Sequence, residues 1–227
     1  MKNKIVHVDL KGAQPLSPSK SPFWEQWCLY LKKECHVDGL LLEWEDSLPI
    51  NVLSLPSNHD KARFVYSTDE AVNIVKTAEK SGLNIIPLIQ TFGHLEYLLK
   101  HESYSHLKEV KDYPDCLLPA EKETDESFQI ISNLVDQVLS FTPNISTLHI
   151  GGDEVWHLGN GERSKVRMTQ EGATKIEIYL RHMNLVVQHL RRKYPSIQNI
   201  LIWDDMFRSC NADHIKVFHN SLFPLFE

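Results

Sequence analysis

Short apolar runs of strand length alternate along this chain with longer segments in which apolar residues recur every three or four positions. The short runs predict β-strands, and the longer segments predict helices that bury one face. The order of strand, helix and strand repeats about four times, which is typical of parallel βαβ units. The predicted strands cover residues 4–10, 40–44, 84–91, 146–150 and 199–204.

The clearest predicted helices lie between these strands, and they cover about residues 22–33, 68–80, 127–140 and 172–193. The helix at 68–80 has a start signal, because Ser67 and Glu70 stand at the spacing of a capping box, and Gly82 follows its end. The last helix has an apolar stripe, and Pro195 prevents its continuation. That stripe consists of Ile176, Leu180, Met183, Val187 and Leu190.

The predicted strands also show which face is buried, because alternate side chains of a strand point to opposite faces. In the strand at 40–44, Leu40, Leu42 and Trp44 alternate with Leu41 and Glu43. One face is apolar, and the other turns polar toward the end of the strand. This pattern is typical of a TIM-type (β/α)8 barrel with its site at the mouth. An open doubly wound sheet is less well supported, since such sheets are apolar on both faces and the expected glycine fingerprint is missing.

A chemically unusual sequence follows the fourth predicted strand, where two glycines precede two adjacent acids, Asp153 and Glu154. Taken alone, the segment fits a surface turn as well as an active site, since glycine and aspartate are ordinary turn residues. A strand that ends on Gly151 and Gly152 gives up packing and allows a ligand to approach its backbone. The other predicted strands favour the active site, because polar residues gather after them too.

These other polar residues comprise acids, a histidine and a tryptophan that follow neighbouring strands. Glu45 follows the second strand, His94 the third, and Trp203 and Asp205 belong to the end of the fifth. Carboxylates accept hydrogen bonds from sugar hydroxyls, an indole packs on the apolar face of a sugar ring, and a protonated acid can protonate a glycosidic oxygen. The pattern therefore indicates a site that binds and cleaves a sugar.

The charge and composition exclude several other classes. The formal net charge is −6, so nucleic acid and anionic membranes are not expected partners. No signal peptide or spanning helix is evident, and we expect an intracellular protein. The histidines and cysteines lack the spacing of a metal site, so we expect no metal and no cofactor. We expect most of the remaining histidines to be solvated, among them His101, His106, His182 and His189.

The run from Leu148 to Glu154 resembles the signature of the family 20 glycoside hydrolases, the β-N-acetylhexosaminidases. Phe92, Gly93 and His94 resemble the Pro-Gly-His of that family at its third strand, and the segments 8–12, 41–46 and 88–96 resemble a nucleocytoplasmic branch of it. The resemblance implies a hydrolase of terminal N-acetylhexosamine residues, galactosamine or glucosamine, on glycoconjugates, in the cytoplasm and nucleus. A homodimer is among the assemblies that this interpretation allows.

The resemblance also implies residue roles in a substrate-assisted retaining mechanism, in which the acetamido group of the substrate acts as nucleophile. Glu154 would be the general acid and base, and Asp153 would orient the acetamido group. His94, Glu45, Trp203 and Asp205 would contact the sugar or support the acids. Secreted members carry an arginine at the first strand where this chain has Lys11, which would take that contact.

The length predicts an incomplete barrel, because such a barrel usually needs about 250 residues and this chain has 227. We expect about the first five βα units in residues 1–210 and a non-barrel tail at 211–227. The chain would then be a shortened product. Two alternatives stay open at this stage: an inactive product of the same fold that binds glycans or the full-length enzyme, and a metal-dependent barrel hydrolase of another class.

Overall fold

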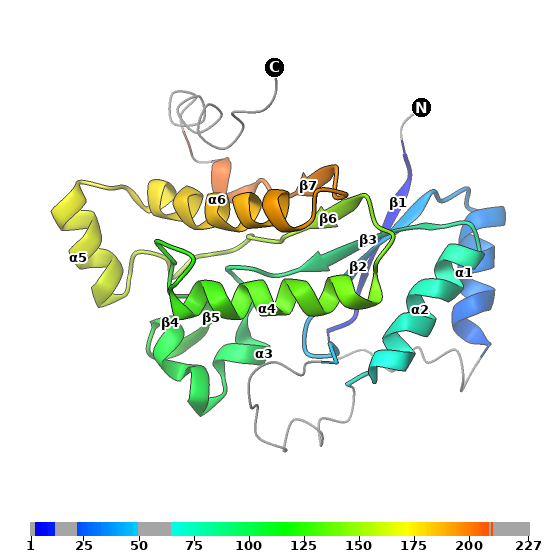
Figure 1. The fold of residues 1–227 in the computed structure, drawn as a ribbon, viewed down its shortest axis with the longest axis horizontal. Helices are drawn as coiled ribbons and strands as arrows, with labels where there is room; N and C mark the ends of the chain where they lie inside the picture. Colours follow the sequence, from blue (N-terminus) through cyan, green and yellow to red (C-terminus); the bar gives the residue numbers. More distant parts are fainter. Residues whose placement is uncertain (1–2, 12–21, 50–64, 209, 211–227) are drawn as a thin grey trace. The chain divides into compact units, whose positions relative to one another are not determined.

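The structure is a computed structural model, and it describes residues 3–11, 22–49, 65–208 and 210. Strands and helices alternate along the chain (Figure 1). The described chain falls into two compact units. The first unit comprises the residues up to Ile89 together with 133–149 and 196–200. The second comprises 90–132, 150–195 and the residues from Leu201 on.

Five strands form the main sheet, and their spatial order follows their order in the chain. They are β1 (Ile5–Asp9), β2 (Gly39–Trp44), β3 (Asn84–Ile89), β6 (Thr147–His149) and β7 (Asn199–Leu201). The pairs β1 with β2, β2 with β3 and β3 with β6 are parallel. A doubly wound sheet reverses its strand order at a switch point, whereas a (β/α) barrel does not. The unreversed order therefore confirms the expected barrel type of fold, of which five strands are described.

The predicted strands are all present, although β1, β3, β6 and β7 are shorter than expected. Strand β2 is buried on both faces: Leu40, Leu42 and Trp44 are buried on one, and Leu41 and Glu43 on the other. A buried carboxylate needs polar partners, because an isolated charge is costly to remove from water. His7 is such a partner for Glu43, since its Nε2 lies 2.8 Å from the Glu43 carboxylate.

Two helices accompany the strands of the first unit, α1 (Phe23–Lys33) and α2 (Thr68–Lys80). They pack against each other through Trp24, whose indole Nε1 donates to the backbone oxygen of Ile74 at 2.9 Å. Helix α2 begins as predicted, since the Ser67 side chain accepts from the backbone N–H of Glu70 and the Glu70 carboxylate accepts from that of Ser67. This capping box satisfies two N–H groups that the first turn leaves without a helical partner.

The second unit contains a small antiparallel hairpin that the sequence pattern did not predict. Its strands are β4 (Lys108–Val110) and β5 (Tyr113–Leu117). Such strands are too short to show a clear alternation, and Pro114 within β5 argues against a strand from sequence alone. The other elements of this unit are α3 (Glu96–Leu99), the 3-10 helices η2 (Glu102–Leu107) and η3 (Asp205–Phe207), α5 (Glu162–Glu171) and α6 (Lys175–Lys193). Helix α4 (Glu126–Phe141) begins in the second unit and ends in the first.

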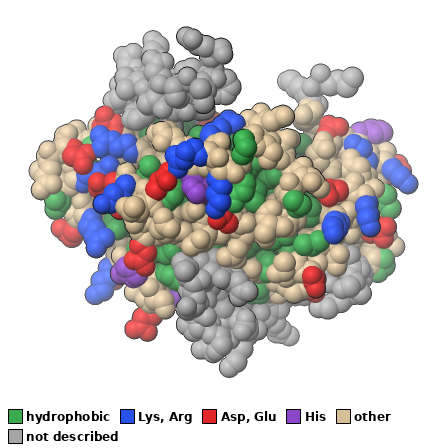
Figure 2. All heavy atoms as spheres, viewed as in Figure 1, with side chains coloured by type: hydrophobic (Ala, Val, Ile, Leu, Met, Phe, Trp, Pro, Cys, Tyr) green, Lys and Arg blue, Asp and Glu red, His purple; other side chains and the backbone are tan. Residues whose placement is uncertain are grey.

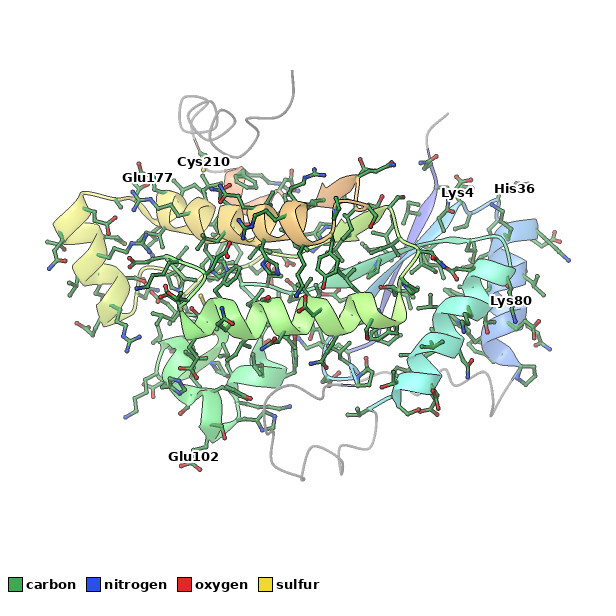
Figure 3. The ribbon with its side chains drawn as sticks, in the orientation of Figure 1. Lys4, His36, Lys80, Glu102, Glu177 and Cys210 are labelled. Carbon is green, nitrogen blue, oxygen red and sulfur yellow. The ribbon has the colours of Figure 1, made fainter. Side chains whose placement is uncertain are left out.

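The predicted start of the last helix at residue 172 is wrong. Gly172 has a left-handed backbone (φ 66°) and ends α5. A new helix, α6, begins after Thr174 with a second capping box to Glu177. Glu177 is labelled at the start of this helix in Figure 3. The buried face of α6 also differs from the predicted stripe, because Ile176 and Val187 are only half-buried. The buried residues of α6 are Ile178, Tyr179, Leu180, His182, Met183, Val186 and Leu190.

Three remaining expectations concern the tail and the partners. The predicted tail at 211–227 lies outside the described residues. No helix in the described ranges is long and apolar enough to cross a membrane. On the face drawn in Figure 2, basic and acidic side chains are interspersed rather than gathered into a basic patch.

Candidate active site

The two glycines after β6 are required by the close approach of other groups. Gly151 (φ 65°) and Gly152 (φ 87°) both have left-handed backbones. A Cβ on Gly151 would lie 2.0 Å from Oε1 of Gln90, and a Cβ on Gly152 would lie 2.7 Å from the hydroxyl of Tyr179. Glycine avoids both the steric cost of the left-handed region and these overlaps. The backbone can therefore bend sharply where the chain turns from the strand to the acids.

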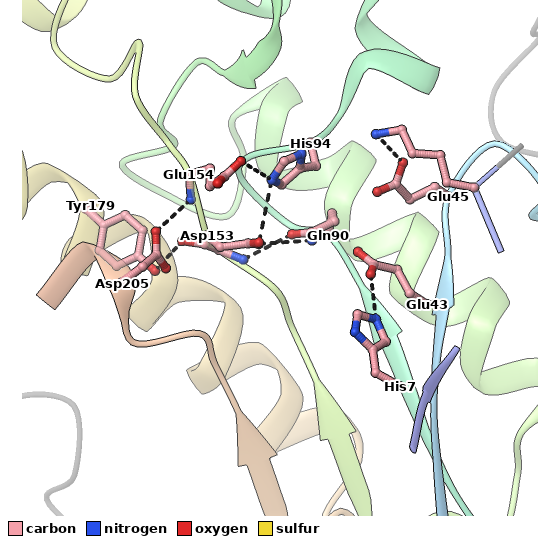
Figure 4. A network of polar contacts seen from close by, with 11 residues as sticks. His7, Glu43, Glu45, Gln90, His94, Asp153, Glu154, Tyr179 and Asp205 are labelled. Carbon is pink, nitrogen blue, oxygen red and sulfur yellow. Dashed lines mark hydrogen bonds and ion pairs between the residues drawn. The ribbon is translucent and has the colours of Figure 1, made fainter. Parts of the chain in front are cut away.

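Asp153 is held by two side chains that come from the segment after β3 (Figure 4). Gln90 Nε2 donates to Oδ1 of Asp153 at 3.0 Å, while Oε1 of Gln90 accepts from the backbone N–H of Gly152 at 3.1 Å. His94 Nε2 lies 3.5 Å from Oδ2 of Asp153. Burial raises the pKa of Asp153, but the hydrogen bonds from His94 and Gln90 outweigh it and the pKa is lowered overall. Asp153 is therefore held as a carboxylate near neutral pH.

Glu154 stands in a different environment, because its side chain is 55% exposed while that of Asp153 is 25% exposed. Its backbone is left-handed (φ 49°), which is uncommon for a residue with a side chain. The Glu154 backbone N–H donates to Oδ2 of Asp205 at 2.9 Å, which stabilises this conformation. His94 Nε2 lies 3.4 Å from the Glu154 carboxylate, so one imidazole stands between the two acids.

His94 reaches both acids because the loop that bears His94 contacts the backbone of the loop that bears Asp153 and Glu154. A Cβ on Gly93 would lie 2.3 Å from the carbonyl oxygen of Asp153, so only glycine allows this contact. His94 itself has a left-handed backbone (φ 52°). Backbone outliers of this kind store strain and are found preferentially at functional sites. The two loops that bear His94 and the acid pair are thus fitted to each other.

The structure brings together four of the residues predicted from the sequence, namely His94, Asp153, Glu154 and Asp205. Trp203 is half-buried and joins the same segment, since its backbone N–H donates to the carbonyl oxygen of Gly151 at 3.2 Å. Oδ1 of Asp205 is buried and has no hydrogen-bond partner in the described part of the chain.

The other two predicted residues, Lys11 and Glu45, pair with each other in the first unit. Lys11 Nζ lies 2.9 Å from the carboxylate of Glu45, whose side chain is 4% exposed. Burial raises the pKa of Glu45 to about 7, even though Lys11 opposes the shift. In the same unit His7 Nε2 contacts the carboxylate of Glu43 at 2.8 Å (Figure 4). The assignment of Lys11 and Glu45 to sugar binding stays a prediction.

Sequence reasoning missed two residues that shape the site. Gln90 fixes Asp153, and the only signal for it was a polar residue at the end of a buried strand. The hydroxyl of Tyr179 donates to the carbonyl oxygen of Gly152 at 2.8 Å. Tyr179 lies in α6, far along the chain, so nothing near the acid pair indicates it.

The expectation that His182 is solvated is wrong. Its side chain is completely buried beside Phe92, with the ring centroids 4.2 Å apart. Nε2 lies 2.9 Å from the carbonyl oxygen of Thr91, and Nδ1 accepts from the backbone N–H of Ala120 at 3.1 Å. Burial lowers the pKa of His182 to about 4, so the ring is neutral at physiological pH. His182 thus holds the segment before His94 through its contact with Thr91.

No group of three or more histidine, cysteine, aspartate or glutamate side chains is placed to hold a metal ion within the described residues.

Residues 31–221 match the model of glycosyl hydrolase family 20, catalytic domain. The chain belongs to glycosyl hydrolase family 20. Two relatives are described as hexosaminidase D: the chain is 36% identical over 217 residues to one from Bos taurus and 37% identical over 212 residues to one from Homo sapiens. It spans 58% and 41% of their lengths, while 94% and 93% of this chain is covered.

Solved structures of family 20 enzymes show the same fold at low sequence identity. A chitobiase from Flavobacterium johnsoniae superposes with a TM-score of 0.67 at 18% identity, covering 90% of this chain and 32% of the chitobiase chain. An exo β-N-acetylglucosaminidase from Vibrio harveyi, solved with N-acetylglucosamine, gives 0.63 at 17% identity and covers 88% and 35%. These similarities support the barrel type of fold of a family 20 catalytic domain.

Proposed function

We propose that this chain carries the catalytic acids of a β-N-acetylhexosaminidase, which removes terminal N-acetylhexosamine residues from glycoconjugates. The observation that supports this proposal is the different treatment of two adjacent carboxylates. Asp153 is enclosed and kept ionised by Gln90 and His94, whereas Glu154 is exposed to solvent. Family membership adds the substrate class, because the curated relatives are named hexosaminidases.

In the proposed reaction Glu154 gives its proton to the glycosidic oxygen while the carbonyl oxygen of the substrate's 2-acetamido group attacks the anomeric carbon. The leaving alcohol departs with the proton, and a cyclic oxazolinium ion forms. The fixed carboxylate of Asp153 accepts the acetamido N–H and stabilises the positive charge that develops there. Glu154 then removes a proton from a water molecule as the water oxygen attacks the anomeric carbon. The bond from that carbon to the acetamido oxygen breaks, so the acetamido group is restored and the configuration at the anomeric carbon is retained.

The contacts around the acids fit these two roles. An electrostatic stabiliser works best when it is oriented before the reaction, and Asp153 has partners for both carboxylate oxygens. A proton donor must reach the leaving oxygen, and the exposed side chain of Glu154 can do so. Asp205 contributes by holding the Glu154 backbone.

The test is turnover of the 4-nitrophenyl β-glycosides of N-acetylgalactosamine and N-acetylglucosamine by the purified chain. The effect of removing the proton donor is measured on an alkyl β-glycoside of the same sugar, because an alcohol that leaves poorly needs the proton. On this substrate we expect Glu154→Gln to lower kcat/KM by about 10²- to 10⁴-fold. Asp153→Asn should lower it by about 10²- to 10³-fold. Glu25→Gln is the matched control, since Glu25 is an exposed acid on α1, and it should leave turnover unchanged. A folded wild-type chain without turnover would contradict the proposal.

A second substrate series tests the role of the acetamido group. The matching β-glucoside and β-galactoside carry a hydroxyl in place of the acetamido group, so they lack the nucleophile of the proposed reaction. We expect no measurable hydrolysis of either by the wild-type chain. Equal rates for the acetamido and hydroxyl substrates would show that the reaction uses another nucleophile.

A further inference from the structure

Three aromatic residues of the second unit lie near the acid pair, on the loop that follows Glu154 and on the hairpin of β4 and β5. They are the exposed Tyr113 and Trp156 and the half-buried His157, which follows Trp156 in the chain and stacks on Tyr113, and we call these three residues the aromatic ledge. Trp156 is 65% exposed and Tyr113 is 50% exposed, so both rings offer apolar surface to a ligand. Both are far more open to solvent than the buried Phe92 and Tyr179 below the site.

The ledge follows directly from the proposed proton donor. Trp156 lies two residues after Glu154, and its backbone N–H donates to the Glu154 carbonyl oxygen at 2.7 Å. The intervening Val155 is buried, so the chain is pinned between the donor and the tryptophan. Trp156 therefore stays close to Glu154 whatever rotamer its side chain adopts.

The hairpin of β4 and β5 attaches the rest of the ledge to the other active-site loop. The backbone N–H of Leu95 donates to the carbonyl oxygen of Asp115 at 3.1 Å, and that of Leu117 donates to Phe92 at 3.1 Å. Tyr113 lies two residues before Asp115 on the same strand. The hairpin is thus bonded to the segment that carries His94.

Two members of the ledge, Tyr113 and His157, hold each other in place. The ring of His157 stacks on that of Tyr113, with centroids 4.0 Å apart and an angle of 17° between the planes. His157 Nδ1 also contacts the Asp115 carboxylate at 2.8 Å, which fixes the ring from its edge. An aromatic surface that is ordered before binding loses little entropy when a ligand covers it.

A buried carboxylate on the hairpin holds the loop behind the ledge. Glu109 accepts the backbone N–H groups of Gly159 at 2.8 Å and Gly161 at 3.1 Å, and the hydroxyl of Ser164 at 3.0 Å. A Cβ on Gly161 would lie 2.0 Å from the Glu109 carbonyl oxygen, so the loop and the hairpin are in direct backbone contact. The loop that bears Trp156 and His157 is therefore fixed at both ends.

We propose that the aromatic ledge binds the sugar that leaves, the residue next to the terminal N-acetylhexosamine of a β-linked oligosaccharide. The inference rests on the proposed function, because it places the leaving group by the position of the proton donor. The glycosidic oxygen must lie within hydrogen-bond distance of Glu154, so the leaving sugar begins beside that residue. Its apolar C–H face suits an aromatic ring, while Asp153, on the enclosed side, takes the acetamido group.

The proposal concerns binding to a second sugar, so the test compares two inert ligands by calorimetry with the whole chain. One is an S-linked N-acetylhexosaminyl disaccharide, and the other is the methyl thioglycoside of the same terminal sugar. We expect wild type to bind the disaccharide about tenfold more tightly, and Trp156→Ala to remove most of that advantage while leaving methyl thioglycoside affinity within about twofold. Trp156→Phe should retain most of it.

Tyr113→Ala should also weaken disaccharide binding, by a smaller factor than Trp156→Ala. The matched control is Tyr30→Ala, which removes an equally large exposed ring (58% exposed) from α1 in the other unit and should change neither affinity. Circular dichroism of each variant shows that the fold is retained.

Several results would contradict the proposal that the aromatic ledge binds the leaving sugar. Equal affinity of wild type for the two ligands would do so while leaving the proposed function intact, provided that chromogenic substrate is turned over. An equal loss of both affinities in Trp156→Ala would show a structural role. A wild-type dimer that Trp156→Ala converts to monomer, with no change in ligand affinity, would make the ledge a protein interface. Absence of both turnover and sugar binding would contradict the proposed function itself.

Discussion

At the scale of single residues, the geometry of the site depends on three glycines. Gly93, Gly151 and Gly152 all lie where a Cβ would overlap a neighbouring group. The sequence indicated the pair at 151–152 because two glycines at a strand end are unusual, and it indicated Gly93 through its position before His94. It could not indicate what the glycines make room for, because Gln90 and Tyr179 come from distant parts of the chain.

A pair of substitutions separates the two reasons for glycine. Gly172 and Gly152 are both left-handed, but a Cβ on Gly172 meets nothing within 4 Å, whereas one on Gly152 would overlap Tyr179 and Met183. We expect Gly172→Ala to lower the free energy of unfolding by about 1 kcal/mol through backbone strain alone. Gly152→Ala should cost about 1–3 kcal/mol more, because it adds overpacking. Urea denaturation measures the free energy of unfolding of both variants. An equal loss in the two would show that Tyr179 and Met183 move aside for the added Cβ without cost in stability.

At the scale of elements, the sequence predicted regular structure well where the apolar period is long. All five predicted strands are present, as are α1, α2 and α4, because each buries a recognisable apolar set. The prediction was wrong at Gly172, where a glycine within a helical pattern ends one helix before another begins. It also missed the hairpin of β4 and β5, whose stability comes from contacts with distant loops rather than from its own pattern.

The hairpin gives an element-scale prediction through Glu109. Replacing this residue by Ala leaves three buried donors without their acceptor, the N–H groups of Gly159 and Gly161 and the Ser164 hydroxyl. We expect Glu109→Ala to lower the free energy of unfolding by about 3 kcal/mol or more. Hydrogen exchange in the loop at 155–161 should accelerate in parallel. Glu109→Gln keeps an acceptor oxygen and should cost less than half as much; equal losses would mean that the carboxylate oxygens do not hold the loop.

At the scale of the whole molecule, two carboxylates with opposite pKa shifts shape the pH dependence of stability. The pKa of Asp153 is lowered from 3.8, so its stabilising contribution is present above that value and is lost as the pH falls through the folded pKa. The pKa of Glu45 is raised from 4.5 to about 7, so the folded state binds the proton more tightly. The contribution of Glu45 to the free energy of unfolding is therefore fully present below pH 4.5 and is lost as the pH rises to about 7.

The opposite directions of the two pKa shifts predict that substitutions of Glu45 and Asp153 change the free energy of unfolding in different pH ranges. Glu45→Gln should flatten the decline between pH 5 and about 7, because no proton is then exchanged in that range. Asp153→Asn should flatten the decline on the acid side of 3.8. Chemical denaturation at a series of pH values checks both, with Glu25→Gln as a matched control. A wild-type slope in Glu45→Gln would show that another group controls the neutral limb.

The arrangement of glycines and aromatic residues has a consequence for how related chains can diverge. Positions 93, 151 and 152 are closed to side chains, so the geometry of the acid pair tolerates little variation. Trp156 lies on the loop that follows the acid pair and Tyr113 on strand β5, and both are exposed to solvent, where substitution disturbs no core packing. Mutation could therefore alter which oligosaccharides are preferred while the bond-breaking apparatus stays unchanged, which lets selectivity evolve separately from catalysis.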